Sequence, residues 1–84
     1  MEETKQRLRS IYARALRLPP GAAPVAGDDL VRSLGIDSID AMEILIWVED
    51  EFHITIDDQY LSPQLVNSID ALAEFVERAR VQEV

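Results

Sequence analysis

The chain has 84 residues, of which 48% are hydrophobic and 29% charged, and its formal net charge is −8. This length allows one small domain with a modest core, and the hydrophobic share is too high for a disordered chain. Cysteine is absent, which excludes a disulfide framework, a thiolate zinc site and a cysteine nucleophile. No apolar run reaches the ~18 residues of a membrane span, and the N-terminus lacks the apolar segment of a signal peptide, so we expect a cytoplasmic protein.

The acidic residues are concentrated in one part of the chain. Between Arg32 and Arg78 the sequence has eleven Asp and Glu residues and no Lys or Arg. Such a region repels nucleic acid and anionic lipid and attracts basic protein surfaces. We therefore expect protein partners, no binding to nucleic acid or membrane, and a monomer.

Helical periodicity occurs in three long segments. The expected helices span residues 3–18, 38–53 and 68–80, and Pro19-Pro20 ends the first of them. We expect a short fourth helix, capped by Asp57 or Asp58, between the second and third segments. The predicted fold class is therefore all-α: residues 1–84 form a single small four-helix bundle with three long helices, one short helix and a long first loop.

Two irregular segments connect these helices. Residues 19–37 form the long loop, in which Asp28 or Asp29 is expected to cap a short turn while Leu30, Val31 and Leu34 pack inward. Two glycines in this loop do not form a phosphate-binding motif, because no Gly-Lys-Ser/Thr follows them. Residues 54–56, Ile-Thr-Ile, alternate like a strand but have no partner strand, so we expect an extended link with Ile56 turned inward.

The segment Leu34 to Phe52, with the sequence LGIDSIDAMEILIWVEDEF, is the most informative part of the chain. Asp37 is placed to be the N-cap of the second helix, and Asp40 adds a second negative charge to its first turn. Ser38 then begins the helix with its hydroxyl exposed beside free backbone N–H groups. A phosphate ester is favoured at such a position because a helix N-terminus attracts anions.

This helix has more apolar residues than one buried face uses. The expected core stripe, with Ile44 at its margin, is Ala41, Leu45, Val48 and Phe52. Ile39, Met42 and Ile46 lie on a different flank, and Trp47 points to a third side among carboxylates, where we expect it to be partly exposed. Exposed apolar residues surrounded by acidic ones are typical of a docking surface.

The Leu-Gly-x-Asp-Ser motif followed by an acidic, apolar helix resembles the acyl carrier protein family, and the similarity covers most of the chain. The resemblance implies a 4′-phosphopantetheine arm on Ser38, next to Asp37 of the motif, with acyl groups held as thioesters on the thiol of the arm. Two residues differ from the family pattern: Ile39 replaces the usual Leu after the serine, and Trp47 replaces a small residue.

The resemblance also implies partners. A phosphopantetheinyl transferase would attach the arm, and acyl-loading and acyl-processing enzymes (a ligase or adenylating enzyme, an acyltransferase, a ketosynthase) would dock on the second helix. The protein itself would catalyse nothing and bind no metal. The expected partner surface consists of Ile39, Met42, Glu43, Ile46, Trp47, Glu49, Asp50 and Asp57.

Three other functions compete with that of an acyl carrier. A hydrolase is excluded because His53, the only histidine, lies ~22 Å from Ser38 along the same helix. An aminoacyl or peptidyl carrier of nonribosomal peptide type shares the fold and the serine, and a non-carrier helical adaptor, in which Ser38 only caps the helix, also stays open.

The pathway is equally open: fatty-acid, polyketide and dedicated starter-unit routes use this pattern. The Pro/Ala/Gly loop and Trp47 favour specialised biosynthesis, such as that of an antibiotic.

Overall fold

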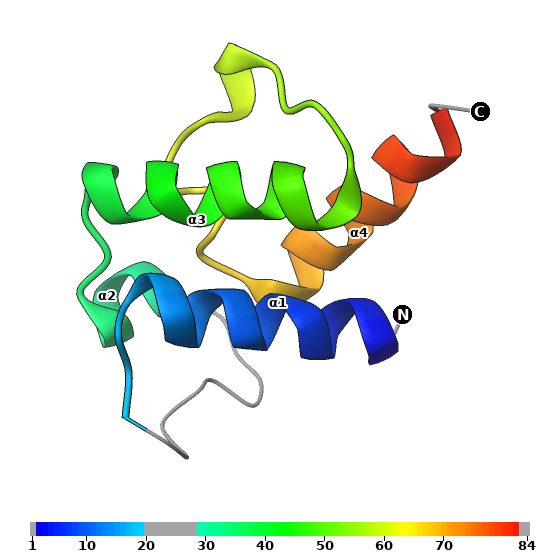
Figure 1. Ribbon diagram of the computed structural model, residues 1–84. Helices are drawn as coiled ribbons and strands as arrows, with labels where there is room; N and C mark the ends of the chain where they lie inside the picture. The colour runs from blue at the N-terminus through cyan, green and yellow to red at the C-terminus, as the bar shows by residue number, and fades with distance from the viewer. Residues whose placement is uncertain (1, 20–28, 83–84) are drawn as a thin grey trace.

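The computed structural model describes residues 2–19 and 29–82. Its elements are α1 (Glu2–Ala15), α2 (Leu30–Leu34), α3 (Ser38–Phe52), the short 3-10 helix η1 (Asp58–Tyr60) and α4 (Ile69–Gln82). No strand occurs in these two segments, and the predicted all-α class is confirmed. Figure 1 shows α1 and α3 running antiparallel, and α1 contacts both α3 and α4. None of the described helices is long and apolar enough to cross a membrane.

One hydrophobic core joins the three long helices. Ile44 is part of it and is fully buried, so its predicted place at the margin of the stripe was wrong. The link after α3 contributes both Ile54 and Ile56 to the same core, although only Ile56 was expected to turn inward. The fully buried large side chains are Tyr12, Leu8, Ile44, Leu45, Ile69, Leu72, Val48, Val66 and Val76.

The first helix ends at Ala15, not at Leu18 as predicted. The N–H of Leu18 donates to the carbonyl oxygen of Ala13 at 2.9 Å, and Arg17 has φ 55°. This is the Schellman arrangement, in which a residue just past the helix takes the left-handed conformation. The chain therefore leaves the helix before it reaches Pro19, whose ring also keeps Leu18 out of the helical region.

Two of the candidate capping residues, Asp29 and Asp57, make no side-chain cap bond. Asp29 precedes α2 in the left-handed conformation, and its carboxylate pairs with Arg32 (3.0 Å) instead of capping the helix. Asn67 replaces it, because its carbonyl and side-chain oxygens accept the first two N–H groups of α2 at 3.0 and 2.8 Å. Asp57 precedes η1 without a side-chain cap bond. The alternative candidate Asp28 lies outside the described residues.

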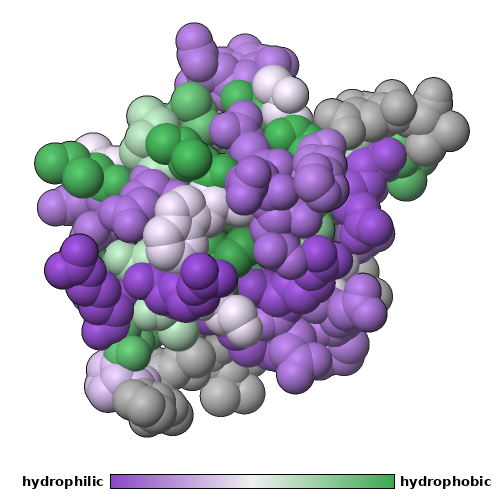
Figure 2. All heavy atoms as spheres, in the orientation of Figure 1, coloured by the Kyte–Doolittle hydropathy of each residue, from purple (hydrophilic) through white to green (hydrophobic). Residues whose placement is uncertain are grey.

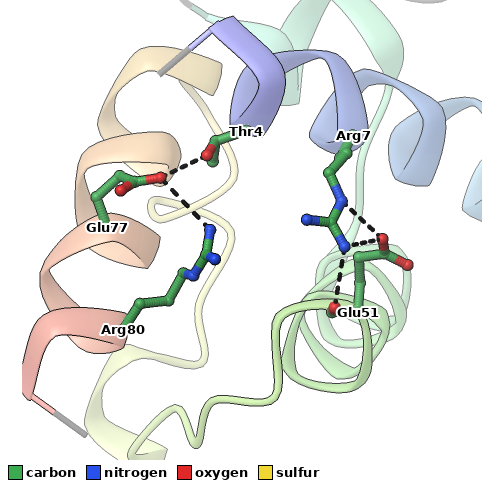
Figure 3. A network of polar contacts seen from close by, with 5 residues as sticks. All are labelled: Thr4, Arg7, Glu51, Glu77 and Arg80. Atoms are coloured by element: carbon green, nitrogen blue, oxygen red, sulfur yellow. Dashed lines mark hydrogen bonds and ion pairs between the residues drawn. The ribbon is translucent and has the colours of Figure 1, made fainter. Parts of the chain in front are cut away.

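Charged contacts join the three long helices at one end of the bundle (Figure 3). Arg7 of α1 donates to the carboxylate of Glu51 on α3, with Nε at 2.8 Å. The hydroxyl of Thr4 donates to Glu77 on α4, and Arg80 lies 3.7 Å from the same carboxylate. The Arg7 contact therefore holds the C-terminal end of α3 against α1, and the Thr4 contact holds α1 against α4.

Phe52 closes the core beneath this network. The guanidinium carbons of Arg7 and Arg80 lie 4.8 and 5.9 Å from the centre of its ring. Cations over an aromatic face are attracted by its electron density, and the ring also covers their apolar stems. Ser38 lies at the opposite end of α3, and therefore far from this network.

Tyr12 connects α1 to the segment before α4. Its side chain is fully buried, and its hydroxyl donates to the carbonyl oxygen of Val66 at 2.6 Å. Burial raises the pKa of Tyr12 far above its ordinary value of 10, because the phenolate would lose its solvation. The unfolded chain therefore releases this proton first, and the stability that neutral Tyr12 contributes is complete below pH ~10 and lost as the pH rises above it.

The variant Tyr12→Phe tests this contact. Leaving the Val66 carbonyl unpaired should lower the free energy of unfolding at pH 7 by about 1–2 kcal/mol. In urea titrations between pH 8 and 11, wild type should lose up to ~1.4 kcal/mol per pH unit above pH 10 from this group, and the variant should lack that component. Tyr60→Phe, at an exposed tyrosine, is the control and should leave the alkaline limb unchanged.

Candidate functional site

Ser38 is the first residue of α3, and its side chain is exposed. Asp37 is the N-cap: its carboxylate accepts the N–H of Asp40 at 2.8 Å, and the Asp40 carboxylate lies 3.5 Å from the N–H of Asp37. This reciprocal pair is a capping box. The N–H groups of Ser38 and Ile39 have no acceptor in the described part of the chain, so the first turn still favours an anionic group beside the hydroxyl.

The residues before Ser38 fix its position. Gly35 follows α2 as its C-cap with φ 66°, a conformation that favours glycine. The next residue, Ile36, is buried, and its N–H donates to the carbonyl oxygen of Val31 at 2.9 Å. The hydroxyl of Ser38 is therefore presented from a rigid support, two residues after a core anchor and one after a helix cap.

An open hollow of about 500 Å³ begins at Ser38 and continues along α3; its lining is almost entirely apolar. We call it the α3 groove, and it is lined by Ser38, Ile39, Met42, Glu43, Ile46 and Trp47. The side chains of Ile39, Ile46 and Met42 are 77%, 51% and 41% exposed. In Figure 2 hydrophobic atoms interrupt the hydrophilic surface at the left, where α3 begins.

Trp47 is half-buried and packs against the edge of the core. It is not on a separate side of α3 as the helical wheel suggested, because it lines the α3 groove with Ile39 and Ile46. The guanidinium carbon of Arg14, on α1, lies 5.1 Å from the centre of its ring. Sequence reasoning missed Arg14, since nothing in the sequence of α3 indicates which residue of the first helix meets the indole.

The carboxylates of the predicted partner surface lie in different surroundings. Glu43 lines the α3 groove, and Asp50 is exposed beside Trp47. Glu49 is turned back, since its carboxylate accepts the N–H of Ile56 at 2.7 Å and so holds the link that follows α3. Asp57 is exposed but lines another hollow, between this link and α4. The structure therefore brings Glu43 and Asp50 to the groove and its flank, and separates Glu49 and Asp57 from it.

His53 and the carboxylates near α3 form no metal site in the described part of the chain. His53 is exposed and ends α3 in the left-handed conformation, with its N–H bonded to the carbonyl oxygen of Glu49. Among the described residues no group of three or more His, Cys, Asp or Glu is arranged to hold a metal ion. The hydroxyl group in the lining of the α3 groove is that of Ser38.

Comparison with known proteins assigns the family. The sequence matches the family described as "Phosphopantetheine attachment site" over residues 6–76. An acyl carrier protein of Phaeodactylum tricornutum is 32% identical over 93% of this chain and 99% of its own length. An acyl carrier protein of a Cylindrotheca species is 36% identical over 74% of this chain and 76% of its own. The chain belongs to the acyl carrier protein family.

Other relatives agree with this assignment. "Acyl carrier protein 3" of Ralstonia nicotianae is 33% identical over 86% of this chain and 79% of its own length. "Acyl carrier protein 1, chloroplastic" of Hordeum vulgare is 32% identical, and this chain spans half of its length. No solved structure matches the sequence.

Family membership fixes the prosthetic group. Members are carriers without catalysis of their own, and the chain bears a covalent phosphopantetheine. The site fits such a group: an exposed hydroxyl accepts a phosphate ester, unpaired N–H groups favour its charge, and an apolar groove adjoins it.

Two variants of Asp37 separate its hydrogen bond from its charge. Asp37→Ala removes the acceptor of the Asp40 N–H and should lower the free energy of unfolding by about 1 kcal/mol. Asp37→Asn keeps an acceptor and should stay within ~0.3 kcal/mol of wild type. Urea unfolding measures both; an equal loss in the two variants would mean that the charge, not the cap, stabilises α3.

Proposed function

We propose that Ser38 is the attachment site of phosphopantetheine and that the protein carries acyl intermediates of fatty-acid or polyketide-type synthesis. The observation that supports this most directly is the exposed Ser38 hydroxyl at the first residue of α3, held by a capping box and opening onto an apolar groove. When bound, the arm supplies a thiol that holds the acyl group as a thioester.

A phosphopantetheinyl transferase would modify Ser38 with coenzyme A. The hydroxyl oxygen attacks the phosphorus attached to pantetheine, a Ser–O–P bond forms, and the pyrophosphate bond breaks to release the adenine nucleotide. A base of the transferase would take the hydroxyl proton, since the carboxylate of Asp37, next to Ser38, already accepts the N–H of Asp40. Asp37 and Asp40 accept hydrogen bonds from the backbone and position the serine without entering the reaction.

The enzymes that load and process the acyl group would dock on α3. Ile39, Met42 and Ile46 offer the apolar contact, and Glu43 and Asp50 the charges that attract basic residues of a partner. Contacts of this kind are weakened by salt, because exposed charges mainly affect the rate of encounter. The carboxylate of Glu49 contributes less than the sequence suggested, because it already accepts a backbone N–H.

An acyl cargo is favoured over an aminoacyl cargo. The relatives carry the name acyl carrier protein, and the lining of the groove is apolar apart from Glu43 and the Ser38 hydroxyl. A monomer and a cytoplasmic location stay predictions; the Hordeum vulgare relative is named as chloroplastic. The loop that favoured specialised biosynthesis lies mostly outside the described residues.

Intact mass spectrometry tests the attachment site. After incubation with coenzyme A and a broad-specificity phosphopantetheinyl transferase, wild type should gain the mass of one phosphopantetheine, and Ser38→Ala should gain none. Ser33→Ala, at an exposed serine of α2, is the matched control and should be modified like wild type.

Two results of this measurement would contradict the proposal, and each has a different meaning. Modification of Ser38→Ala would assign the arm to another residue. An unmodified wild type, beside a carrier protein that is modified in the same reaction, would contradict the carrier function and favour the helical adaptor.

Neutralising the charges beside the α3 groove tests docking. The double variant Glu43→Gln/Asp50→Asn should slow transfer by the same transferase roughly three- to tenfold at low ionic strength, and the difference from wild type should shrink at high salt. Glu74→Gln, which removes an exposed charge on α4, is the control. An equal loss in Glu74→Gln would assign the effect to net charge and not to this surface.

A further inference from the structure

Arg14 of α1 lies beside acidic residues of α3, in a small hollow of about 160 Å³. We call it the Arg14 hollow, and it is lined by Ile11, Arg14, Trp47, Asp50 and Glu51. Resting on the proposed function, we propose that the docking surface extends from α3 into this hollow and that Arg14 selects the partner. The enzyme that fits presents one carboxylate to Arg14, next to basic side chains that meet Glu43 and Asp50.

The first argument is the continuity of the surface. Trp47 lines both the α3 groove and the Arg14 hollow, so the two meet at its side chain. Ile11 and Arg14 come from α1, which packs beside α3. Even a weak protein interface buries on the order of 500 Å² on each side. An enzyme that covers the groove as far as Trp47 therefore also comes next to Arg14.

The second argument is that the N–H groups of Arg14 are available. Its side chain is exposed, and it forms no ion pair with a carboxylate of the described residues, although Asp50 and Glu51 line the same hollow. The carboxylate of Glu51 already accepts Nε of Arg7 at 2.8 Å. A guanidinium offers its donors in a planar fork that matches the two oxygens of a carboxylate.

The third argument is the contact between Arg14 and the indole. The guanidinium carbon lies 5.1 Å from the centre of the Trp47 ring. This contact is favourable and restricts the arginine side chain, so less conformational entropy is lost when a partner binds it. The ring also keeps water from part of the guanidinium, and an ion pair formed in such surroundings is stronger than one in open water.

The pattern of charges makes Arg14 a determinant of specificity. Glu43 and Asp50 attract basic residues, while Arg14 repels them, and residues 33–77 contain no Lys or Arg. A uniformly basic partner therefore meets one unfavourable contact on this surface. A partner with a carboxylate at that point gains a favourable one, and the difference between the two free energies is what discriminates between them.

A series of short helical peptides serves as the probe. Each peptide has Leu on one face and Lys on the other, contains no Trp, and has one Lys at a time replaced by Glu or by Gln. Binding to the full-length protein is followed by the fluorescence of Trp47, the only tryptophan of the chain. At one position, the one that meets Arg14, the Glu peptide should bind about two- to fivefold more tightly than the Gln peptide.

Three variants assign this preference. Arg14→Met keeps an apolar side chain beside the indole but removes the charge, and should abolish the preference for Glu. Arg14→Glu should reverse it, so that the Gln peptide binds more tightly. Arg78→Met, at an exposed arginine of α4, changes the net charge by the same amount and should keep the preference of wild type.

Nuclear magnetic resonance locates the contact directly. In the complex with the preferred Glu peptide, the Nε–H resonance of Arg14 should shift together with the indole N–H of Trp47. With the matched Gln peptide the indole should still shift, because the groove is still occupied, while the Arg14 resonance should stay close to its free position.

Several results would overturn the inference. These are a Glu preference that survives in Arg14→Glu, no position at which Glu is preferred, and no binding of any peptide in the series. A dimer of the protein alone that Arg14→Glu dissociates, measured by sedimentation, would assign the surface to a second copy of the chain. None of these results bears on the modification of Ser38, which intact mass tests separately, so failure of this inference is distinguishable from failure of the proposed function.

Discussion

The packing of α3 against α1 is the constraint on which the rest of the structure depends. Once Leu45 and Val48 are buried in the core that α3 shares with α1, the rotation of α3 about its axis is fixed. Ile39 and Ile46 must then lie outside, although each would stabilise a core if buried. α3 has more apolar residues than its buried face accommodates, so some of them stay exposed. This exposed apolar surface lies beside Ser38, at the start of α3.

The two ends of α3 are held by different forces. At its C-terminal end, Arg7 and Arg80 lie over Phe52 and pair with carboxylates of α3 and α4, so that end is joined to both neighbouring helices. At its N-terminal end the support is local: a capping box and a buried Ile36. This division leaves the surroundings of Ser38 open for an attached group and for a docking enzyme, while the tertiary contacts at the far end keep the helix in place.

The sequence predicted the features that depend on local rules. Helix periodicity gave the three long helices, and the position of Asp37 gave the N-cap of α3, because both depend on local sequence. The features that it missed depend on contacts between distant segments. Asn67 caps α2 across the fold, and Arg14 of α1 stacks on Trp47 of α3; neither is encoded by a spacing. Glu49 was assigned to the surface because a helical wheel does not show that the chain after α3 turns back to it.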